Sequence, residues 1–404
     1  MIVSPHSLFT PLALRHLTLP NRFVRSATYE GWGDAQGMPR PELAEVYRAL
    51  AQGGVGTIVT GFAFVTQQGR AMQPGQCGID TDAQIAPWAH IVARVRDLGL
   101  PTKLLLQIAH TGRQTLRRVT GLPVVGASSR RCSYFQQPVH TLTDAEIRAI
   151  IRAFALAAWR AQQAGFDGVQ VHAAHGYLLH QFLTPWTNRR KDRWAEPTLL
   201  LHEVIVAIRQ QCGDAFPVLV KLSAGDDTTP GLGIEQALHT VKCLEALDVA
   251  AVEVSYGTME YALNIMRGQL PLDVALQVNP LYNRYPAFVR RAWKAYCFPA
   301  YQAKLIPYEE AYNVPAALQL KQHTTLPIIP VGGLRTLATM TACVTTHGLD
   351  AVALCRPLIC EPDLPAQINA GGFVRSRCTN CNLCTIYCDS RQPLRCYQRK
   401  GSSA

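Results

Sequence analysis

Eight short hydrophobic runs recur along the chain, and each is followed by turn-forming residues and then by a stretch with helical spacing. The runs are nearly continuous and rich in Leu, Val and Ile, which is typical of strands buried on both faces. They cover residues 22–27, 56–61, 103–109, 167–174, 217–224, 250–256, 326–333 and 350–356. Amphipathic stretches lie between them, for example at 41–54, 144–166 and 199–213. Thr143 or Asp144 can cap the second of these helices, and Gly165 can end it.

Eight strand–helix units predict an α/β fold, a TIM (β/α)8 barrel of parallel strands. An open, doubly wound sheet is the competing interpretation, but no G-x-G-x-x-G motif follows the first predicted strand. The chain has 404 residues, of which 48% are hydrophobic, so it can bury a large core. We expect residues 1–370 to form the barrel, and residues 371–404 to form a short cysteine-rich extension that binds a metal.

The formal net charge is +11, and part of it lies in the predicted extension. The basic residues of that segment are Arg375, Arg377, Arg391, Arg395, Arg399 and Lys400, against Asp389 as the single acid. A basic balance is compatible with nucleic acid, a membrane surface or an anionic ligand. The sequence has no nucleic-acid-binding motif and no run of ~18 apolar residues without charges. We therefore interpret the charge as a solvated surface together with an anionic cofactor.

The N-terminus and the cysteines bear on the cellular compartment. The first residues lack the charged start, apolar run and small-residue cleavage site of a secretory signal. Of thirteen cysteines, five fall within residues 378–396 and the others are scattered singly. A secreted disulfide scaffold is short and evenly loaded with cysteine, so this pattern favours a reducing cytoplasm and a local metal site.

Polar residues end or follow most of the predicted strands. They are Ser26, Thr28 and Tyr29 after the first run, Gln107 in the third, His172, His175 and Tyr177 after the fourth, and Lys221 in the fifth. Each of these residue types taken alone is more often a satisfied surface or core group than a ligand-binding one. In a parallel barrel, however, functional groups gather at the carboxyl ends of the strands. The sequence therefore predicts that these side chains converge at one mouth.

The last two predicted strands end in residues suited to phosphate. Gly332 and Gly333 follow the seventh run, and Cys355 and Arg356 end the eighth. Glycine lets backbone N–H groups approach an anion, and arginine adds a forked donor. This corner of the barrel is thus predicted to hold a phosphorylated cofactor.

Two further side chains suit the ring system of a flavin. Gln107 can present both a donor and an acceptor to the edge of a heterocycle. Lys221 supplies a positive charge where a reduced, anionic ring needs one. Together with the phosphate corner, these residues favour flavin mononucleotide (FMN) over a sugar phosphate.

At this point the chain resembles the Old Yellow Enzyme family of NADH:flavin oxidoreductases. Five motifs carry the resemblance in order: "LFTPLALRHLTLPNRFVRSA" (8–27), "LLLQIAHTGRQ" (104–114), "AGFDGVQVHAAHGYLLHQFLTPWTNRRKDR" (164–193), "PVGGL" (330–334) and "LCRPLICEPDL" (354–364). It extends over about residues 8–370. The resemblance implies a TIM barrel with FMN at the carboxyl-end mouth.

The resemblance also assigns contacts to the flavin. It implies that Ser26, Ala27, Thr28 and Tyr29 line the flavin through their backbone, Phe62 lies beside it, Gln107 faces the pyrimidine edge, Lys221 faces the N1–C2 side, and Gly332, Gly333, Cys355 and Arg356 hold the phosphate. Tyr29 stands near flavin N5, where relatives usually carry Cys, Thr or His. A bulkier phenol there is expected to shift the flavin potential or to narrow the pocket.

By the same resemblance, His172 and His175 bind the oxygen of an electron-withdrawing group on the substrate, and Tyr177 is the proton donor. Hydride from NAD(P)H then passes through the flavin to an activated, α,β-unsaturated carbonyl compound. His180 is expected to belong to a structural turn. Two alternatives stay open: a flavin-dependent dehydrogenase that passes electrons from an amine or another organic donor through a cluster to a carrier, and a non-catalytic redox sensor.

An insert of about residues 258–312 separates the sixth and seventh predicted strands. Its aromatic and basic residues can roof the substrate site, although an additional surface helix and loop is an equally good interpretation because barrels tolerate insertions.

The segment "CTNCNLCTIYCDSRQPLRC" holds the clustered cysteines. A C-x2-C-x2-C run brings three thiolates to one centre, which serves an iron–sulfur cluster or zinc. The first four cysteines also match the bacterial ferredoxin spacing C-x2-C-x2-C-x3-C. Resemblance to the branch that includes trimethylamine dehydrogenase and 2,4-dienoyl-CoA reductase instead implies a [4Fe–4S] cluster with these ligands: Cys378, Cys381, Cys384 and Cys396. Cys388 would then be a spare thiol.

In that branch a large nucleotide-binding part follows the cluster, whereas this sequence ends eight residues after Cys396. We therefore expect electrons to come from NAD(P)H at the flavin or from a separate electron-transfer protein, unless the metal only fastens the extension. Relatives often associate, so a homo-oligomer is possible, but the sequence identifies no interface.

Overall fold

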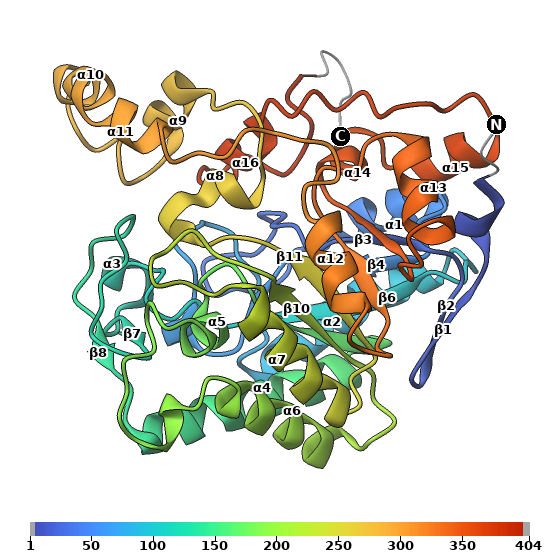
Figure 1. The fold of residues 1–404 in the computed structure, drawn as a ribbon, viewed down its shortest axis with the longest axis horizontal. Coiled ribbons are helices and arrows are strands. Elements are labelled where there is room, and N and C mark those ends of the chain that lie inside the picture. The colour runs from blue at the N-terminus through green and yellow to red at the C-terminus, as the bar shows by residue number, and fades with distance from the viewer. Residues whose placement is uncertain (1–4, 399–404) are drawn as a thin grey trace.

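The structure is a computed structural model, and it describes residues 5–398. Its centre is a barrel of parallel strands (Figure 1). The strands are β3 (Phe23–Arg25), β4 (Thr57–Val59), β6 (Lys103–Ala109), β9 (Gly168–Ala173), β10 (Val218–Ser223), β11 (Ala251–Ser255), β12 (Ile328–Pro330) and β13 (Val352–Leu354). A bridge between Val331 and Ala353 joins the end of β12 to β13 and closes the ring. The predicted TIM barrel is confirmed, and the open doubly wound sheet is wrong.

Helices pack around the outside of the strands (Figure 1). They are α1 (Leu43–Gln52), α2 (Ile85–Arg96), α4 (Asp144–Gln163), α6 (Leu199–Cys212), α7 (Ile234–Ala246), α12 (Val314–Lys321), α13 (Leu337–Thr345), α14 (Arg356–Cys360) and α15 (Leu364–Asn369). Thr143 caps α4, because its hydroxyl accepts from the Glu146 N–H while the Glu146 carboxylate accepts from the Thr143 N–H at 2.7 Å. No helix in the described part of the chain is long and apolar enough to cross a membrane.

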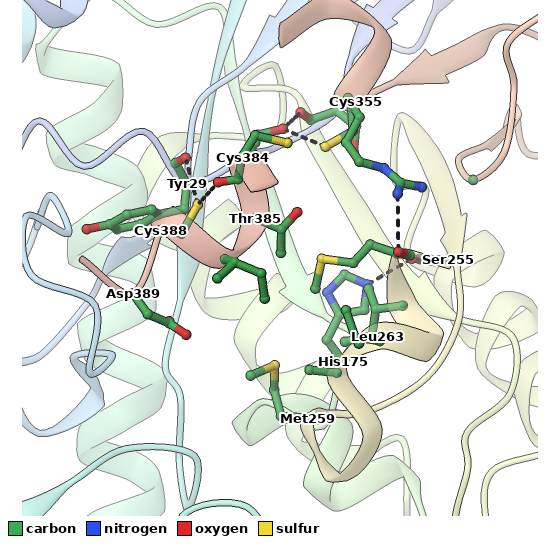
Figure 2. Close-up of a pocket in the computed structure, with 18 of the residues that line it drawn as sticks. Tyr29, His175, Ser255, Met259, Leu263, Cys355, Cys384, Thr385, Cys388 and Asp389 are labelled. Atoms are coloured by element: carbon green, nitrogen blue, oxygen red, sulfur yellow. Dashed lines mark hydrogen bonds between the residues drawn. The ribbon is translucent and has the colours of Figure 1, made fainter. Parts of the chain in front are cut away.

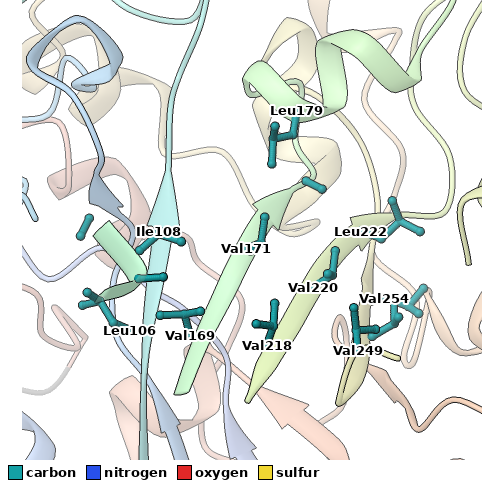
Figure 3. Close-up of a cluster of buried hydrophobic side chains, with 14 of the residues drawn as sticks. Leu106, Ile108, Val169, Val171, Leu179, Val218, Val220, Leu222, Val249 and Val254 are labelled. Carbon is teal, nitrogen blue, oxygen red and sulfur yellow. The ribbon is translucent and has the colours of Figure 1, made fainter. Parts of the chain in front are cut away.

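The barrel strands alternate between two environments. Side chains such as Leu106, Val169 and Val220 point outward and pack under the helices (Figure 3). Inward-pointing residues at the base, such as Leu105 and Leu219, form a separate apolar cluster. A hairpin of β1 (Leu12–Leu14) and β2 (Leu17–Leu19) contributes to this cluster and covers the base. Because side chains alternate along a strand, the inward positions above this plug are available for polar groups.

The insert and the C-terminal extension meet above the mouth. The insert carries α8 (Ala262–Ile265), α9 (Leu272–Val278), α10 (Ala287–Tyr296) and α11 (Phe298–Gln302), and the extension carries α16 (Leu383–Tyr387). Figure 1 shows α9 next to α16. The backbone of Gln269 in the insert donates to the carbonyl of Asn380 in the extension at 2.9 Å. The two predicted units were 1–370 and 371–404. The described residues leave out 1–4 of the first unit and 399–404 of the second, and the latter range includes Arg399 and Lys400.

Candidate active site

A cavity of about 300 Å³ lies at the carboxyl-end mouth of the barrel. Every predicted catalytic and FMN-contacting residue lines it: Ser26, Ala27, Thr28, Tyr29, Phe62, Gln107, His172, His175, Tyr177, Lys221, Gly332, Gly333, Cys355 and Arg356. The structure therefore brings together residues that are spread over more than 300 positions of the sequence. His180 is not in the lining; it is fully buried and its Nε2 lies 3.3 Å from the Asp226 carboxylate.

A chain of buried polar side chains forms what we call the barrel floor: Ser26, Gln107, Gln170, Lys221 and Glu253. Gln107 donates to Gln170 at 2.7 Å, and Gln170 donates to Glu253 at 2.7 Å. The Lys221 ammonium lies 3.0 Å from Glu253 and donates to the Ser26 hydroxyl at 2.8 Å. Each of these residues is at most 4% exposed. Lys221 keeps a third N–H, and Gln107 keeps its carbonyl oxygen, for a ligand above them.

Two members of the floor, Gln170 and Glu253, were missed by the sequence analysis. Strand register explains their position: Gln170 pairs with Gln107 on β6, and Glu253 pairs with Lys221 on β10. A signal was present, since Gln170 precedes His172 by two residues and Glu253 precedes Ser255 by two. Residues two apart on a strand share a face.

The predicted phosphate corner is a backbone cradle. Gly332 and Gly333 adopt φ values of 130° and 76°, where side chains are rarely tolerated. A Cβ on Gly332 would stand 2.5 Å from the ring of Tyr312. Arg356 donates to the side chain of Asn382 at 2.5 Å and to the Met266 carbonyl at 3.3 Å.

Arg335 is a second cation at this end of the cavity, and the sequence analysis missed it. It follows the glycine pair by two residues and lines the cavity. One guanidinium nitrogen donates to the Ser376 carbonyl at 3.2 Å. Its Nε is buried and has no hydrogen-bond partner among the described residues. A buried donor without a partner is costly, and an anion beside it would satisfy it.

Three rings stand over the floor: His172 lies in β9, and His175 and Tyr177 follow that strand. The ring centroids of His172 and His175 are 5.0 Å apart, and those of His172 and Tyr177 are 4.8 Å apart. Phe62 closes the group with its ring centroid 5.4 Å from that of Tyr177. Nδ1 of His172 accepts from the Ala174 N–H at 3.3 Å, and Nε2 of His175 lies 2.8 Å from the Ser255 hydroxyl. His175 has a φ of 60°, in the left-handed region, within the turn that follows β9.

Burial controls the protonation of these rings. Burial, together with the charge of Lys221, holds the pKa of His172 well below its ordinary value. Burial and the neighbouring His172 do the same to the pKa of His175. Burial raises the pKa of Tyr177 above that of a free phenol. Two neutral imidazoles and a protonated phenol therefore face the cavity at neutral pH.

Tyr29 extends the wall of aromatic rings on the side of β3. Its ring centroid lies 6.1 Å from that of Phe62, and its hydroxyl donates to the carbonyl of Pro74. Burial raises the pKa of this phenol. The hydroxyl is thus anchored to the protein while Tyr29 lines the cavity.

The insert and the extension together form a roof over the floor. From the insert, apolar and aromatic side chains line the cavity: Met259, Leu263, Leu272, Leu276, Tyr282, Trp293, Phe298 and Tyr301. Figure 2 shows Thr385, Cys388 and Asp389 of the extension across the cavity from Met259 and Leu263. Aromatic residues of the insert thus line the cavity as expected, whereas none of its basic residues, all within the described part of the chain, is in the lining. The helix α10 also exposes Phe288 and Tyr296 to solvent.

A model of the NADH:flavin oxidoreductase / NADH oxidase family matches residues 7–295. The chain belongs to this family. The match confirms the resemblance drawn from the five motifs.

Individual relatives cover the chain to different extents. It is 28% identical over 383 residues to the NADH oxidase of Thermoanaerobacter brockii, covering 93% of this chain and 53% of that protein. It is 29% identical over 413 residues to the 4,4'-dithiodibutanoate disulfide reductase of Rhodococcus erythropolis, covering 96% of this chain and 95% of that protein. A 2-naphthoyl-CoA reductase structure matches with a TM-score of 0.78 at 22% identity, covering 96% of this chain and 56% of that one. The chain thus spans about half the length of some relatives; the structural match shows the shared fold.

The residues present fit an FMN. The floor supplies an amide and an ammonium for the pyrimidine edge, and the glycine cradle with Arg335 and Arg356 supplies donors for a phosphate. Glycine is needed at position 332, because a side chain there would collide with Tyr312. A member of a flavin-dependent family thus has matching groups at both ends of the cavity.

A second, smaller cavity of about 230 Å³ lies under the extension. All four predicted metal ligands line it: Cys378, Cys381, Cys384 and Cys396. Cys360, which the sequence analysis did not single out, lines it as well; burial and then the neighbouring Cys396 raise its pKa to about 12. Cys388 instead lines the larger cavity. Within residues 5–398, no three His, Cys, Asp or Glu side chains are arranged to hold a single metal ion.

Proposed function

We propose that the chain binds FMN and transfers hydride from NAD(P)H to the β-carbon of an α,β-unsaturated carbonyl compound, with Tyr177 as the proton donor. The observation that carries the proposal is the group of three rings, with centroids 4.8 and 5.0 Å apart, above a floor that ends in an amide and an ammonium. When bound, FMN supplies a hydride acceptor and donor at its N5.

Each part of the cavity has a role in holding the cofactor. The backbone of residues 26–29 and the ring of Phe62 flank the isoalloxazine. Gln107 and Lys221 bind its pyrimidine side, and Lys221 stabilises negative charge there. The cradle of Gly332 and Gly333, the backbone of Cys355 and the guanidinium of Arg356 hold the phosphate.

The two histidines bind and polarise the substrate carbonyl. Because Nδ1 of His172 accepts a hydrogen bond, the neutral ring carries its proton on Nε2, which can donate to a carbonyl oxygen. A neutral donor draws electron density from the conjugated carbon without adding a buried charge. Both properties favour hydride addition at the β-carbon.

Tyr177 completes the reaction by protonating the α-carbon. Its phenol remains protonated at neutral pH because burial raises its pKa. The Phe62 ring packs against it and holds its orientation. Since nicotinamide and substrate would use the same face of the cavity, we expect ping-pong kinetics.

The variant Tyr177→Phe tests the role of the phenol. We expect the rate of enone reduction to fall by about 10²–10⁴, while reduction of the enzyme by NAD(P)H keeps its wild-type rate. Stopped-flow absorbance of the flavin separates the two half-reactions. Equal rates of 2-cyclohexenone reduction by the variant and the wild type would remove Tyr177 from the mechanism.

A second candidate function is an electron-transferring dehydrogenase with a [4Fe–4S] cluster held by Cys378, Cys381, Cys384 and Cys396. The supporting observation is the second cavity, which shares Arg356 and Cys384 with the first. A cluster there would lie beside the flavin. The four cysteine sulfurs that bind a [4Fe–4S] cluster lie further apart than four that bind one tetrahedral zinc ion. A cavity of about 230 Å³ therefore suits the cluster better.

Metal analysis of protein purified without oxygen tests this second function. About four irons per chain and an electron paramagnetic resonance signal after reduction support it, and one zinc or no metal overturns it. A separate electron-transfer protein, a homo-oligomer and a cytoplasmic location stay predictions.

A further inference from the structure

One carboxylate faces the roof of the active-site cavity. Of the described residues that line the cavity, Asp389 is the only acid. It follows α16 in the extension, and Figure 2 shows it on the cavity wall, across from Met259 and Leu263 of the insert. The reaction proposed above gives this group no task.

Two amides fix the orientation of Asp389. Gln73 donates to Oδ1 at 2.9 Å, and Asn279 donates to Oδ2 at 2.5 Å. The Asn279 side chain cannot turn freely, because its Oδ1 accepts from the Leu281 N–H at 2.8 Å while its Nδ2 also donates to the Tyr134 hydroxyl at 2.6 Å. The carboxylate is therefore held by two separate segments of the chain, and a third segment, through Tyr134, helps to hold Asn279.

The charge of Asp389 has no counter-ion. Both groups that stabilise it are neutral amides, and no Lys, Arg or His within residues 5–398 forms an ion pair with it. Burial raises its pKa to about 6, and the hydrogen bonds from Gln73 and Asn279 oppose this shift. At neutral pH most molecules thus carry an unpaired negative charge in an enclosed site. Such a charge is unfavourable unless a cation joins it.

The surroundings of Asp389 are aromatic. Tyr134, Tyr282, Trp293 and Tyr301 line the same part of the cavity wall as the insert. Aromatic faces attract organic cations, and the attraction grows when water is excluded. A carboxylate among such rings combines a counter-ion with a surface for an alkylated or aryl-substituted ammonium group.

We propose that the roof of the cavity binds a protonated amine on an apolar skeleton, with Asp389 as its counter-ion. The inference rests on the proposed function, and it names the class of compound that reaches the flavin. Asp389 lines the same cavity as His172, His175 and Tyr177. An amine held at Asp389 therefore leaves the rest of its molecule in the cavity that these three rings line.

Binding of a matched pair of probes tests the proposal without turnover. The probes are 2-phenylethylammonium and 2-phenylethanol, which differ mainly in charge. They are titrated into the protein as purified, with calorimetry and the flavin absorbance as readouts. We expect the wild type to bind the ammonium at least about tenfold more tightly than the alcohol. Equal affinities for the two probes would overturn the proposal.

Variants locate the effect. Asp389→Asn should lose the preference for the ammonium and keep its affinity for the alcohol, whereas Asp389→Glu should retain part of the preference. The control is Asp273→Asn, which changes an exposed acid of α9 that pairs with Lys294 outside the cavity lining. Loss of the preference in the control, or its retention in Asp389→Asn, would overturn the assignment. If Asp389→Asn does not fold, the two affinities of the wild type still decide.

The pH dependence adds a second readout. Affinity for 2-phenylethylammonium should fall as the pH drops through about 6, because Asp389 gains a proton. The other titratable groups whose pKa feels this charge, or that adjoin it, stay neutral across the range because burial raises their pKa: Tyr29, Tyr134, Tyr177, Tyr282 and Cys388. A flat profile would overturn the proposal. Two outcomes separate this inference from the proposed function. If the protein reduces enones but does not prefer the ammonium, only this inference is wrong. If the protein holds no flavin but prefers the ammonium, only the proposed function is wrong.

Discussion

The floor and the roof of the active-site cavity are built in opposite ways. The floor consists of side chains on barrel strands, and each polar group is joined to the next by a hydrogen bond or an ion pair. The roof consists of an insert and a C-terminal extension whose lining is mostly apolar, with one unpaired carboxylate. Strand register fixes the floor, which suits a cofactor of constant shape. The roof is set by loops and short helices, and barrel enzymes vary such segments to change their substrates.

The largest expected effect breaks the floor. Glu253→Ala leaves the Lys221 ammonium buried without its partner, and both side chains are at most 5% exposed. Removing one member of a buried pair costs about 3–5 kcal/mol. We expect the free energy of unfolding, measured in urea, to fall by about that amount. The amount of FMN bound per chain should fall as well.

The matched control for this variant is Glu45→Ala, which removes an acid with a largely exposed side chain from its ion pair with Arg94. Exposed pairs contribute little, so its unfolding curve should overlay that of the wild type. An equal effect of the two substitutions would mean that the floor is no more tightly coupled than the surface.

A smaller effect is expected where the floor meets the roof. In Gly332→Ala the new methyl group collides with the ring of Tyr312 and the side chain of Asn313, so the backbone of the cradle has to shift. We expect FMN affinity to fall by about tenfold to a hundredfold, since overpacking costs about 1–3 kcal/mol. Equilibrium dialysis against FMN measures this.

Gly371→Ala is the control for the cradle, because Gly371 also has a positive φ, of 82°, but nothing within 4 Å of its added methyl group. It should bind FMN like the wild type. If FMN affinity falls by a similar factor in both variants, backbone strain and not the cradle is the cause.

A further effect, which depends on pH, is expected in the roof. The folded-state pKa of Asp389, about 6, exceeds its ordinary value of 3.8, so the folded protein binds this proton more tightly than the unfolded chain does. Stability contributed at this site therefore falls as the pH rises from about 4 to about 6, and no further above that. Urea unfolding at pH 4.5 and pH 7 should show Asp389→Asn gaining stability relative to the wild type at the higher pH. Parallel pH profiles would contradict the assigned pKa.

The sequence predicted the floor better than the roof, for a physical reason. Residues such as Lys221 and His172 were found because the ends of parallel strands must converge, whatever the details of packing. Gln170 and Glu253 were missed because they lie within apolar runs, and only the register places them beside Gln107 and Lys221. Applying the two-residue period outward from His172 and Ser255 would have found them.

The roof could not be predicted from local pattern. Asp389 meets Gln73 across 316 residues of sequence and Asn279 across 110. No periodicity connects these segments, and the spacing of the cysteines drew attention to metal ligation in the same stretch. Cys360 was missed in the same way, because it belongs to α14 and joins the extension only in the folded chain.

The absorption spectrum of the wild-type protein during one reaction cycle, followed without oxygen, tests the central claim most directly. We predict about one oxidised FMN per chain, bleached by NAD(P)H and restored by 2-cyclohexenone. A colourless protein, or a bound flavin that neither nicotinamide reduces, would contradict the account.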